Sequence, residues 1–525
     1  HHLTAYIARA GYLLRQGHFA ADVLLYSPQS TVWSQKVLFG TDRRVMPYGN
    51  VPKTLIANGY DYDPVNDDVL QNRARVENGK IKVGELAYSF VILPNITAIP
   101  VKTLEVLRKF AQGGGMVIAL ESLPSSSVGL ADYRDNDAKV RQIVKELFGA
   151  EGKGHAYHIA DYRIEEPEFN PQEKPYQPTP PLTPPQKAML DIMRRHLAPD
   201  CALEGNRQSD GPAFIHRKIG DLDVYFVTNL QPKPSNVPVT FRISGKRPDR
   251  WDAKTGDISP VRYYRVQNGG IEIPLDLAPW ESTFIVFGPG RDAAHVTKTN
   301  LAEVTGLDST GVTGIVTANG MASVEALHAG QSRNASVTVS DLPQPLPIKG
   351  KWKLALEGVR FPRLDKEVEV LNSWTEDAQT RFFSGTGAYE LDFDLPKEYL
   401  RDDLELVLDL GAVANLAEVI LNGRNVGVSW MQPFRLEVTG AARQGTNNLK
   451  VLVTNNLVNH VLGLKKMPDV PAELEPHYGK TIDIYTMGVA AAKREAQTVK
   501  PQPSGLLGPV QIIARRKVKI GWNHA

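Results

Sequence analysis

Hydrolysis or amide transfer through a protein nucleophile requires a cysteine or serine at a sharp turn after a buried strand. The apolar run at 116–120 (MVIAL) has the length of such a strand, and Glu121 and Ser122 follow it. The single cysteine, Cys201, lies far from this turn, and Ser122 is not framed by a G-x-S-x-G motif. We therefore predict a structural turn here, and the missing cysteine excludes glutamine hydrolysis by this route.

Metal-binding residues show no recognised spacing. The 12 histidines are scattered, without an H-x-x-x-H or HExxH motif, and one thiol rules out a Cys-rich zinc site or an internal disulfide. The acidic run between Asp61 and Asp68 offers hard oxygen ligands but lacks the glycine and the distal glutamate of an EF-hand loop. We predict that this run caps a helix and faces solvent, and we assign no metal ligand in this chain.

Paired carboxylates can hydrolyse glycosidic bonds. Pairs such as Glu165–Glu166 and Asp402–Asp403 are abundant in the chain, and most carboxylates in proteins are surface charges. The residue pattern alone selects neither an acid nor a base.

Aromatic side chains near strand ends or in loops are further candidates, because a pyranose has an apolar face that can lie on an aromatic ring. Core packing is the more frequent role of such residues, and we favour it for Trp430. The substrate contacts that we predict, if the chain binds sugar, are Trp374, Phe382 and Trp430; the wider set of aromatic candidates adds Trp251, Phe383 and Tyr389.

The elements that must position these residues change in character along the chain. Residues 17–204 combine apolar runs of buried-strand length (21–26, 88–93 and 116–120) with amphipathic segments of helix length. Strands separated by such helices predict a parallel, doubly wound α/β sheet. A Pro-rich stretch at 165–185 predicts a loop or an extended linker.

Residues 1–16 are predicted to form an amphipathic helix that Thr4 can cap. Such a helix needs a surface to pack against, either on the residues that follow or on a domain that precedes it. The apolar residues that share one of its faces are Tyr6, Ile7, Ala10, Leu13 and Leu14.

From about residue 205 the chain has the pattern of strands and turns. Short alternating runs predict a β-sandwich at 205–290, and a Val/Thr/Ala/Gly-rich segment predicts a small β bridge at 291–345. Residues 346–525 are predicted to form a jelly-roll domain. Within it, Asn422-Gly423 is a two-residue hairpin signal, because both positions of such a turn need a positive φ.

Length and composition limit the class of protein. The 525 residues fit three or four domains, and 42% hydrophobic with 22% charged residues is typical of soluble globular proteins. The net charge of +2 argues against nucleic acid or anionic membrane as the main partner. No apolar run approaches the ~18 residues of a membrane-spanning helix. We expect a periplasmic or secreted location, with the cytoplasm left open.

Several long segments together resemble glycoside hydrolase family 106, the α-L-rhamnosidases. The resemblance extends over about residues 5–515 and implies an amidotransferase-like α/β domain without the amidotransferase cysteine, then a central sandwich, then a galactose-binding-like jelly roll. The segments that carry it include YIARAGYLLRQGHFAADVLLYSP at 6–28, NGYDYDPVNDDVLQNRARVENGKI at 58–81, VLRKFAQGGGMVIA at 106–119, IHRKIGDLDVYFVTNL at 215–230, RFFSGTGAYELDFDLP at 381–396 and AEVILNGRNVGVSW at 417–430.

In that family the catalytic carboxylates, and the calcium expected near the sugar, belong to a (β/α)₈ barrel of about 250 residues. This chain has room for one small α/β domain, so we expect the barrel before residue 1 and carry no catalytic residue over onto this chain. The resemblance implies the C-terminal accessory part of an inverting enzyme that hydrolyses terminal α-L-rhamnosyl linkages. The expected partners are a rhamnose-containing glycan or glycoside and the preceding barrel.

Two other functions fit the same features. A non-catalytic carbohydrate-binding protein could use one sandwich and its loop aromatics. A relative of the family 2 or family 42 β-galactosidases would share the accessory folds but differ in its sugar, because such folds recur among unrelated activities.

Overall fold

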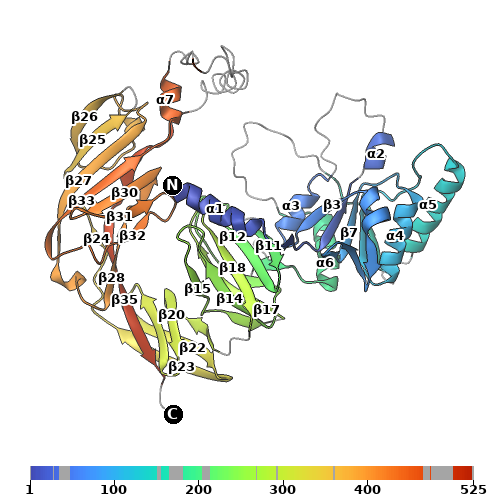
Figure 1. Cartoon of the computed structure of the whole chain (residues 1–525), viewed down its shortest axis with the longest axis horizontal. Helices are drawn as coiled ribbons and strands as arrows, with labels where there is room; N and C mark the ends of the chain where they lie inside the picture. The colour runs from blue at the N-terminus through green and yellow to red at the C-terminus, as the bar shows by residue number, and fades with distance from the viewer. Residues whose placement is uncertain are drawn as a thin grey trace. The chain divides into compact units, whose positions relative to one another are not determined.

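The computed structural model describes residues 2–27, 29–34, 48–149, 155–164, 181–203, 213–267, 269–290, 294–358, 361–464, 473 and 500–522. Two compact units, His1–Thr297 and Lys298–Ala525, make up the chain (Figure 1). Among the described residues, none of the helices combines the length and the apolar character that a membrane span requires. Most of the predicted Pro-rich linker, residues 165–180, lies outside the described residues.

A five-stranded parallel sheet forms the first part of the first unit. Its strand order is β3-β2-β7-β8-β9, and neighbouring strands all run parallel. Strands β2, β7 and β8 are buried along their whole length, as short apolar runs covered on both faces should be. The strands are β2 (Val23–Tyr26), β3 (Tyr62–Val65), β7 (Phe90–Pro94), β8 (Met116–Leu120) and β9 (Ala156–Ile159).

Helices cover both faces of this sheet (Figure 1). On one face, α4 and α5 bury Leu107 and Val140 in a core cluster with Val91 of β7. On the other face, α3 and α6 bury Leu55 and Met189 in a second cluster. The helices are α2 (Gln29–Ser34), α3 (Val51–Ile56), α4 (Val101–Gln112), α5 (Tyr133–Phe148) and α6 (Pro184–His196), and a small antiparallel sheet contains β4 (Arg75–Glu77), β5 (Lys80–Val83) and β6 (Leu86–Tyr88).

Two antiparallel sheets form a sandwich in the rest of the first unit. Their strand orders are β1-β11-β12-β18-β14-β15 and β10-β13-β17-β16. The core between them includes Tyr225, Phe241 and Phe287. The strands are β10 (Cys201–Leu203), β11 (Ala213–Ile219), β12 (Leu222–Thr228), β13 (Ser235–Phe241), β14 (Lys246–Trp251), β15 (Ile258–Pro260), β16 (Arg265–Gln267), β17 (Gly270–Leu277) and β18 (Ser282–Pro289).

The N-terminal segment belongs to this sandwich. Helix α1 (His2–Leu14) packs on the outer face of the larger sheet, where Ala10 shares a buried cluster with Val224 and Phe284. Strand β1 (His18–Phe19) then pairs with β11, with His18 opposite Lys218. The residues that follow the helix therefore supply a surface on which it packs.

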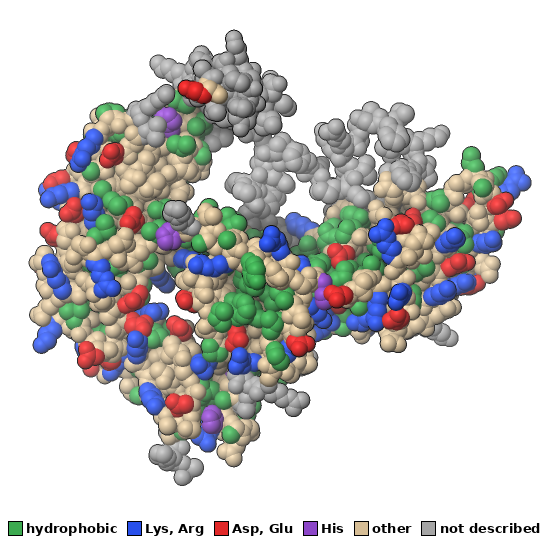
Figure 2. Space-filling view, in the orientation of Figure 1, with side chains coloured by type: hydrophobic (Ala, Val, Ile, Leu, Met, Phe, Trp, Pro, Cys, Tyr) green, Lys and Arg blue, Asp and Glu red, His purple; other side chains and the backbone are tan. Residues whose placement is uncertain are grey.

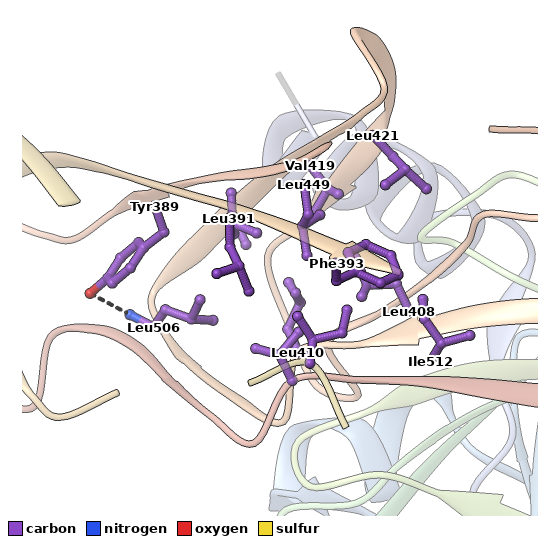
Figure 3. Close-up of a cluster of buried hydrophobic side chains, with 14 of the residues drawn as sticks. Tyr389, Leu391, Phe393, Leu408, Leu410, Val419, Leu421, Leu449, Leu506 and Ile512 are labelled. Atoms are coloured by element: carbon purple, nitrogen blue, oxygen red, sulfur yellow. Dashed lines mark hydrogen bonds between the residues drawn. The ribbon is translucent and has the colours of Figure 1, made fainter. Parts of the chain in front are cut away.

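A second sandwich fills the second unit. One sheet has the order β20-β21-β35-β28-β32, and the other has the order β26-β25-β27-β33-β30-β31. Figure 3 shows the core between them, in which Phe393 of β27 and Leu449 of β33 lie near Leu408 of β28 and Ile512 of β35. The strands are β20 (Glu303–Asp308), β21 (Gly311–Val316), β24 (Leu346–Pro347), β25 (Trp352–Gly358), β26 (Phe361–Val368), β27 (Gly385–Leu395), β28 (Leu404–Asp409), β30 (Leu416–Leu421), β31 (Arg424–Ser429), β32 (Arg435–Glu437), β33 (Gly445–Thr454) and β35 (Gln511–Gly521), with a short pair β29 (Ala412–Ala414) and β34 (Gly505–Gly508).

Part of the predicted bridge at 291–345 joins this second sandwich. Strand β21 pairs with the C-terminal strand β35, from Gly311 opposite Gly521 to Val316 opposite Arg516, and β20 follows β21 at the edge. Strands β22 (Gly320–His328) and β23 (Gln331–Val339) pair with each other as a hairpin. A composition-based boundary at residue 345 cannot show this pairing, because the partner strand lies some two hundred residues further along the chain.

The hairpin predicted at Asn422-Gly423 is confirmed. Their φ angles are 53° and 80°, and Leu421 pairs with Arg424 across the turn between β30 and β31. On the visible face of the described residues, basic and acidic side chains are interspersed (Figure 2), as a net charge near zero leads one to expect.

Candidate functional site

Four neighbouring strands of the sheet that contains β27 begin or end at the same end of that sheet. Thr454, the last residue of β33, pairs with Thr386 of β27 on one side and with Leu416 of β30 on the other. Next to it, Ala417 of β30 pairs with Ser429, the last residue of β31. The loops before β27 and β30 and the loops after β33 and β31 therefore gather at the same end of the sandwich.

These loops carry the three residues predicted to contact sugar. Phe382 lies just before β27, and Trp430 directly follows β31. Trp374 lies in a single 3-10 turn, Trp374–Glu376, and its ring packs on two glycines. A Cβ would lie 2.4 Å from the indole at Gly387 of β27 and 2.8 Å from it at Gly505 of β34. Long-range strand pairing thus brings together loops that are far apart in the sequence.

Trp374 has the surroundings of a core residue and is 3% exposed. Its Nε1 donates a hydrogen bond to Tyr389 Oη at 2.7 Å, and its ring is edge-on to Phe383 at 5.1 Å between centroids. Tyr389 Oη in turn accepts from the backbone N–H of Leu506 at 3.2 Å (Figure 3). Because Trp374 is buried, little of its indole ring is exposed for stacking on a pyranose. The predicted contact between Trp374 and substrate stays a prediction.

Phe382 and Trp430 are more accessible. Phe382 is 44% exposed, and its ring covers Gly463 at the end of α7 (Val458–Gly463), where an added Cβ would come within 2.7 Å of it. Trp430 is half-buried, and nearby Phe434 enters the core. An exposed phenyl ring offers a face for a sugar, so Phe382 has the best surroundings of the three for the predicted role.

A network of uncharged polar groups ties the same loops together. Asn459 of α7 is 1% exposed; its Nδ2 donates to Gln502 O at 2.8 Å and to Ser504 Oγ at 2.9 Å. Asn455 donates to Ser504 Oγ at 3.1 Å and to Phe383 O at 2.9 Å. We call Asn455, Asn459 and Ser504 the amide network. Sequence reasoning did not select it, although the asparagines of 455–459 (NNLVN) directly after a strand were a signal.

A cavity of about 350 Å³ opens beside Trp374 and Tyr389. On its rim, Lys366 Nζ donates to Asp377 Oδ2 at 2.7 Å, and this hydrogen bond lowers the pKa of Asp377 below its ordinary value. The volume is within the range of small-ligand sites, and amide, hydroxyl and carboxylate groups can hydrogen-bond sugar hydroxyls. The other polar rim residues are Asn372, Ser373 and Glu376.

Of the carboxylate pairs named from the sequence, the structure describes Asp402–Asp403, and Asp403 is bound by two arginines. Asp403 Oδ1 accepts from Arg401 Nε at 3.1 Å, and its Oδ2 lies 2.6 Å from Arg516 Nε. Two guanidinium partners give this carboxylate a structural role. Residues 165–166 lie outside the described residues.

The turn after β8 is a strained elbow that holds a glutamate. Glu121 has a φ of 66°, which is rare for a residue other than glycine. Its Oε2 accepts from the Ile164 backbone N–H at 3.1 Å, and its carbonyl oxygen lies 3.2 Å from His158 Nε2. The structural turn predicted from the sequence is therefore present, and its carboxylate holds the loop after β9.

Hydrogen bonds engage much of the acidic run between Asp61 and Asp68, but the prediction that the run faces solvent is wrong for Asp61, which is 6% exposed. Asp67 Oδ1 accepts from Tyr26 Oη at 2.8 Å and from Thr103 Oγ1 at 2.6 Å. Asn66 Oδ1 caps the next turn by accepting from the Val69 backbone N–H at 3.1 Å. In the part of the chain that the structure describes, no three His, Cys, Asp or Glu side chains gather as a metal site requires. The calcium that the resemblance implies was expected in the barrel and stays a prediction.

Known proteins resemble this chain over nearly its whole length. A rhamnosidase structure from Novosphingobium sp. PP1Y is similar over 98% of this chain and 41% of its own, with a TM-score of 0.61 and 22% identity, a level that concerns the fold alone. A curated protein of Formosa agariphila, named "Putative beta-glucuronidase", is 23% identical over 97% of this chain and 56% of its own length. The chain thus spans about half the length of these relatives.

A family model also matches the chain. The model of Glyco_hydro_106, described as alpha-L-rhamnosidase, matches residues 1–265, which is half of the 525 residues. This region contains the parallel sheet, the helix α1 and most of the first sandwich. The chain belongs to glycoside hydrolase family 106, the alpha-L-rhamnosidases.

Proposed function

We propose that this chain is the C-terminal accessory part of an inverting α-L-rhamnosidase that hydrolyses terminal α-L-rhamnosyl linkages. A difference in length carries the proposal: the match with the solved rhamnosidase takes in 98% of this chain but 41% of that one. The remainder of such an enzyme is ample for a (β/α)₈ barrel of about 250 residues. In this proposal the catalytic acid, the catalytic base and any calcium belong to that barrel.

The two accessory folds named from the resemblance form part of the proposal. Numbered along the chain, the strands of the parallel sheet have the order 2-1-3-4-5, which is one of the common orders of doubly wound sheets. Glu121 stands at the elbow where an amidotransferase would carry its cysteine. We assign this region to an amidotransferase-like domain and the second sandwich to a galactose-binding-like jelly roll, in an enzyme that is periplasmic or secreted.

The loop end of the second sandwich is the part of this chain that we expect to meet the glycan. It combines the exposed ring of Phe382, the half-buried Trp430 and the cavity beside Trp374. An aromatic face with hydrogen-bonding groups around it is what a pyranose requires. The expected role is to support the sugar at the entrance of the barrel's site.

Cleavage of nitrophenyl α-L-rhamnoside tests the catalytic assignment. The 525-residue chain alone should release no nitrophenol, whereas the full-length enzyme should release it and should form the inverted anomer first in a proton NMR time course. Turnover by the purified chain alone, retained after repurification, would overturn the assignment of the acid and base to the barrel. Retention of configuration would overturn the inverting mechanism.

A second candidate activity is β-glucuronide hydrolysis, because the curated relative that matches 97% of this chain bears that name. Parallel assays of the full-length enzyme on nitrophenyl β-D-glucuronide, α-L-rhamnoside and β-D-galactoside separate this candidate from the rhamnosidase and from a family 2 or family 42 type galactosidase. Glycan binding without cleavage of any of the three would favour a carbohydrate-binding protein.

A further inference from the structure

A cluster of buried charges lies where the parallel sheet meets the first sandwich, inside the first unit. Its members come from both parts: two aspartates directly precede β2 and β3, and the other residues lie on or beside β10 to β14. We call the cluster the charged joint, and it consists of Asp22, Asp61, Asp200, His216, Asp223, Arg242 and Lys246.

His216 is the centre of the joint and is 3% exposed. Its Nδ1 lies 2.7 Å from Asp200 Oδ2 and its Nε2 lies 3.0 Å from Asp223 Oδ1. The other oxygens of these carboxylates accept from Tyr225 Oη at 2.9 Å and from Lys246 Nζ at 2.5 Å. An ionised carboxylate only accepts hydrogen bonds, so with both carboxylates ionised both ring nitrogens donate and the ring is an imidazolium.

The electrostatics of the site agree with this geometry. Burial alone would lower the pKa of His216, but the hydrogen bonds and charges of Asp200 and Asp223 together raise it above its ordinary value. Burial alone would raise the pKa of Asp223, but hydrogen bonds from His216 and Lys246 lower it to about 2. Both partners therefore favour the ion pair near neutral pH.

The same residues connect the sandwich to the parallel sheet. Arg242, just after β13, contacts both Asp22 and Asp200. The backbone N–H of Ala20 donates to His216 O at 3.0 Å. At Gly59, with a φ of 81°, an added Cβ would lie 2.0 Å from the carbonyl oxygen of Cys201, so the two backbones touch here. The imidazolium is thus linked to the parallel sheet through Asp200, because Arg242 contacts both Asp200 and Asp22.

Charge balance shows why the proton on His216 matters. Three cations, His216, Arg242 and Lys246, face the carboxylates of Asp22, Asp200 and Asp223. Burial raises the pKa of Asp22 above its ordinary value and raises the pKa of the fourth aspartate, Asp61, to about 7. Without its proton, His216 would leave the buried carboxylates with an excess of negative charge. A cavity of about 180 Å³ opens at the joint, and its lining adds the charged or titratable groups His18, Lys80, Glu85 and Lys218. Two more titratable groups, Cys201 and Tyr225, are buried beside the joint, and burial raises their pKa values above the ordinary ones.

We propose that the protonated ring of His216 is a pH-sensitive latch that holds the parallel sheet against the first sandwich, and that its deprotonation loosens their contact. The sign follows from linkage. A group whose folded pKa lies above its unfolded pKa stabilises the fold fully below the unfolded value, and this stabilisation is lost as pH rises through the folded value. The latch is therefore closed below the ordinary pKa of histidine and opens as the pH rises above it. This device is independent of the proposed enzymatic activity.

Amide hydrogen exchange of the 525-residue chain, followed by mass spectrometry from about pH 6 to about pH 10 and corrected for intrinsic rates, tests the latch. Protection at 56–62 and 198–203 should fall with rising pH, by up to about tenfold for each unit by which the folded pKa exceeds the unfolded one. Protection at 449–453 in the second unit serves as the internal reference and should stay constant. Equal pH dependence in the two units would overturn the proposal.

Three variants distinguish a pH-dependent role of His216 from a purely structural one. His216→Gln should give low protection at 56–62 at every pH, whereas His18→Gln, a matched change in the same cavity, should behave as the original protein. Asp223→Asn removes one of the two carboxylates that favour the imidazolium, so it should move the transition to lower pH while the chain stays folded. A transition that Asp223→Asn leaves in place contradicts the proposal even if His216→Gln does not fold.

Discussion

The charged joint of the first unit and the amide network of the second unit both connect distant segments of the chain, the first through ions and the second through uncharged groups. Each ties together segments that are far apart in the sequence: 220 residues separate Asp22 from Arg242, and 45 separate Asn459 from Ser504. The joint uses buried ions, whereas the amide network uses neutral amides and a hydroxyl. Both clusters satisfy buried polar groups, but only the joint contains groups that change charge near neutral pH.

The difference between ionisable and neutral groups determines which part of the molecule has a stability that depends on pH. Buried ions carry a large desolvation penalty that their partners must offset, so removing one partner leaves an uncompensated charge. A neutral amide has a smaller penalty and no protonation equilibrium in the physiological range. We therefore expect the first unit to be the pH-dependent one and the amide network to be indifferent to pH.

Removing one ion from the charged joint should have the largest effect. Asp200→Ala deletes the acceptor shared by His216, Tyr225 and Arg242, and breaking such a buried pair destabilises a protein by about 3–5 kcal/mol. Urea unfolding of the first unit, followed by hydrogen exchange of its peptides, measures the loss. Glu77→Ala, at an exposed ion pair with Lys82, is the control and should leave the unfolding midpoint unchanged. Equal midpoints for Asp200→Ala and the control would show that the joint contributes nothing to stability.

Removing the central amide of the second unit should have a smaller effect. Asn459→Ala leaves the backbone N–H of Gln502 without its acceptor and removes one of the donors to Ser504 Oγ, which corresponds to about 1–3 kcal/mol for a buried polar group. The same urea experiment should show the loss in the second unit, with equal size at about pH 6 and about pH 9 because no group in the network titrates between them. A loss that varied with pH would mean that a charged group outside the network controls this end of the sandwich.

At one position of the charged joint, Asp61, removing a charge should stabilise the first unit. Burial raises the pKa of Asp61 to about 7 from an ordinary value of 3.8, and its Oδ2 is a buried oxygen without a hydrogen-bond partner. The folded state therefore disfavours ionisation, and the penalty grows as pH rises from about 4 to about 7 and is complete above that. Asp61→Asn cannot ionise, so it should stabilise the first unit by up to about 4 kcal/mol at pH 8 and leave it unchanged near pH 4.

The pH difference is the informative readout for Asp61→Asn. A gain of the same size at both pH values would indicate that the asparagine side chain simply packs or hydrogen-bonds better. A loss at pH 8 would mean that the carboxylate of Asp61 is needed as an ion, and the charge balance of the joint would then require a partner for it.

Sequence reasoning succeeded where the signal is local. The strand at 116–120 and the Asn422-Gly423 turn follow from the residue pattern and turn chemistry within a few residues. It missed what depends on pairing at long range. Strand β1 pairs with β11, and β21 pairs with β35; in each case the partner strand lies about two hundred residues further along the chain. No local pattern contains that information.

The two polar clusters were missed for the same physical reason. Asp61 belonged to the acidic run predicted to face solvent, and Asp22 and Asp200 carried no motif; their importance arises only when the fold buries them around His216. The aromatic predictions depended on exposure, which the sequence does not specify: Trp374 is enclosed by Gly387 and Gly505, whereas Phe382 remains exposed. Burial is a property of the assembled core and not of the residue type.

The smallest expected effect distinguishes packing from sugar binding at the loop end of the second sandwich. Trp430 is half-buried, so Trp430→Ala should remove part of its packing and lower stability by about 1 kcal/mol, or about 2–4 °C in the melting temperature of a unit of this size. If Trp430 packs only, the full-length enzyme should keep its KM for a rhamnoside. If it faces the sugar, the melting temperature should hold while KM rises. Phe382→Ala is the matched comparison, because its exposed ring contributes little packing, and a rise in KM there with unchanged melting would place the glycan over α7 and not over the loop after β31.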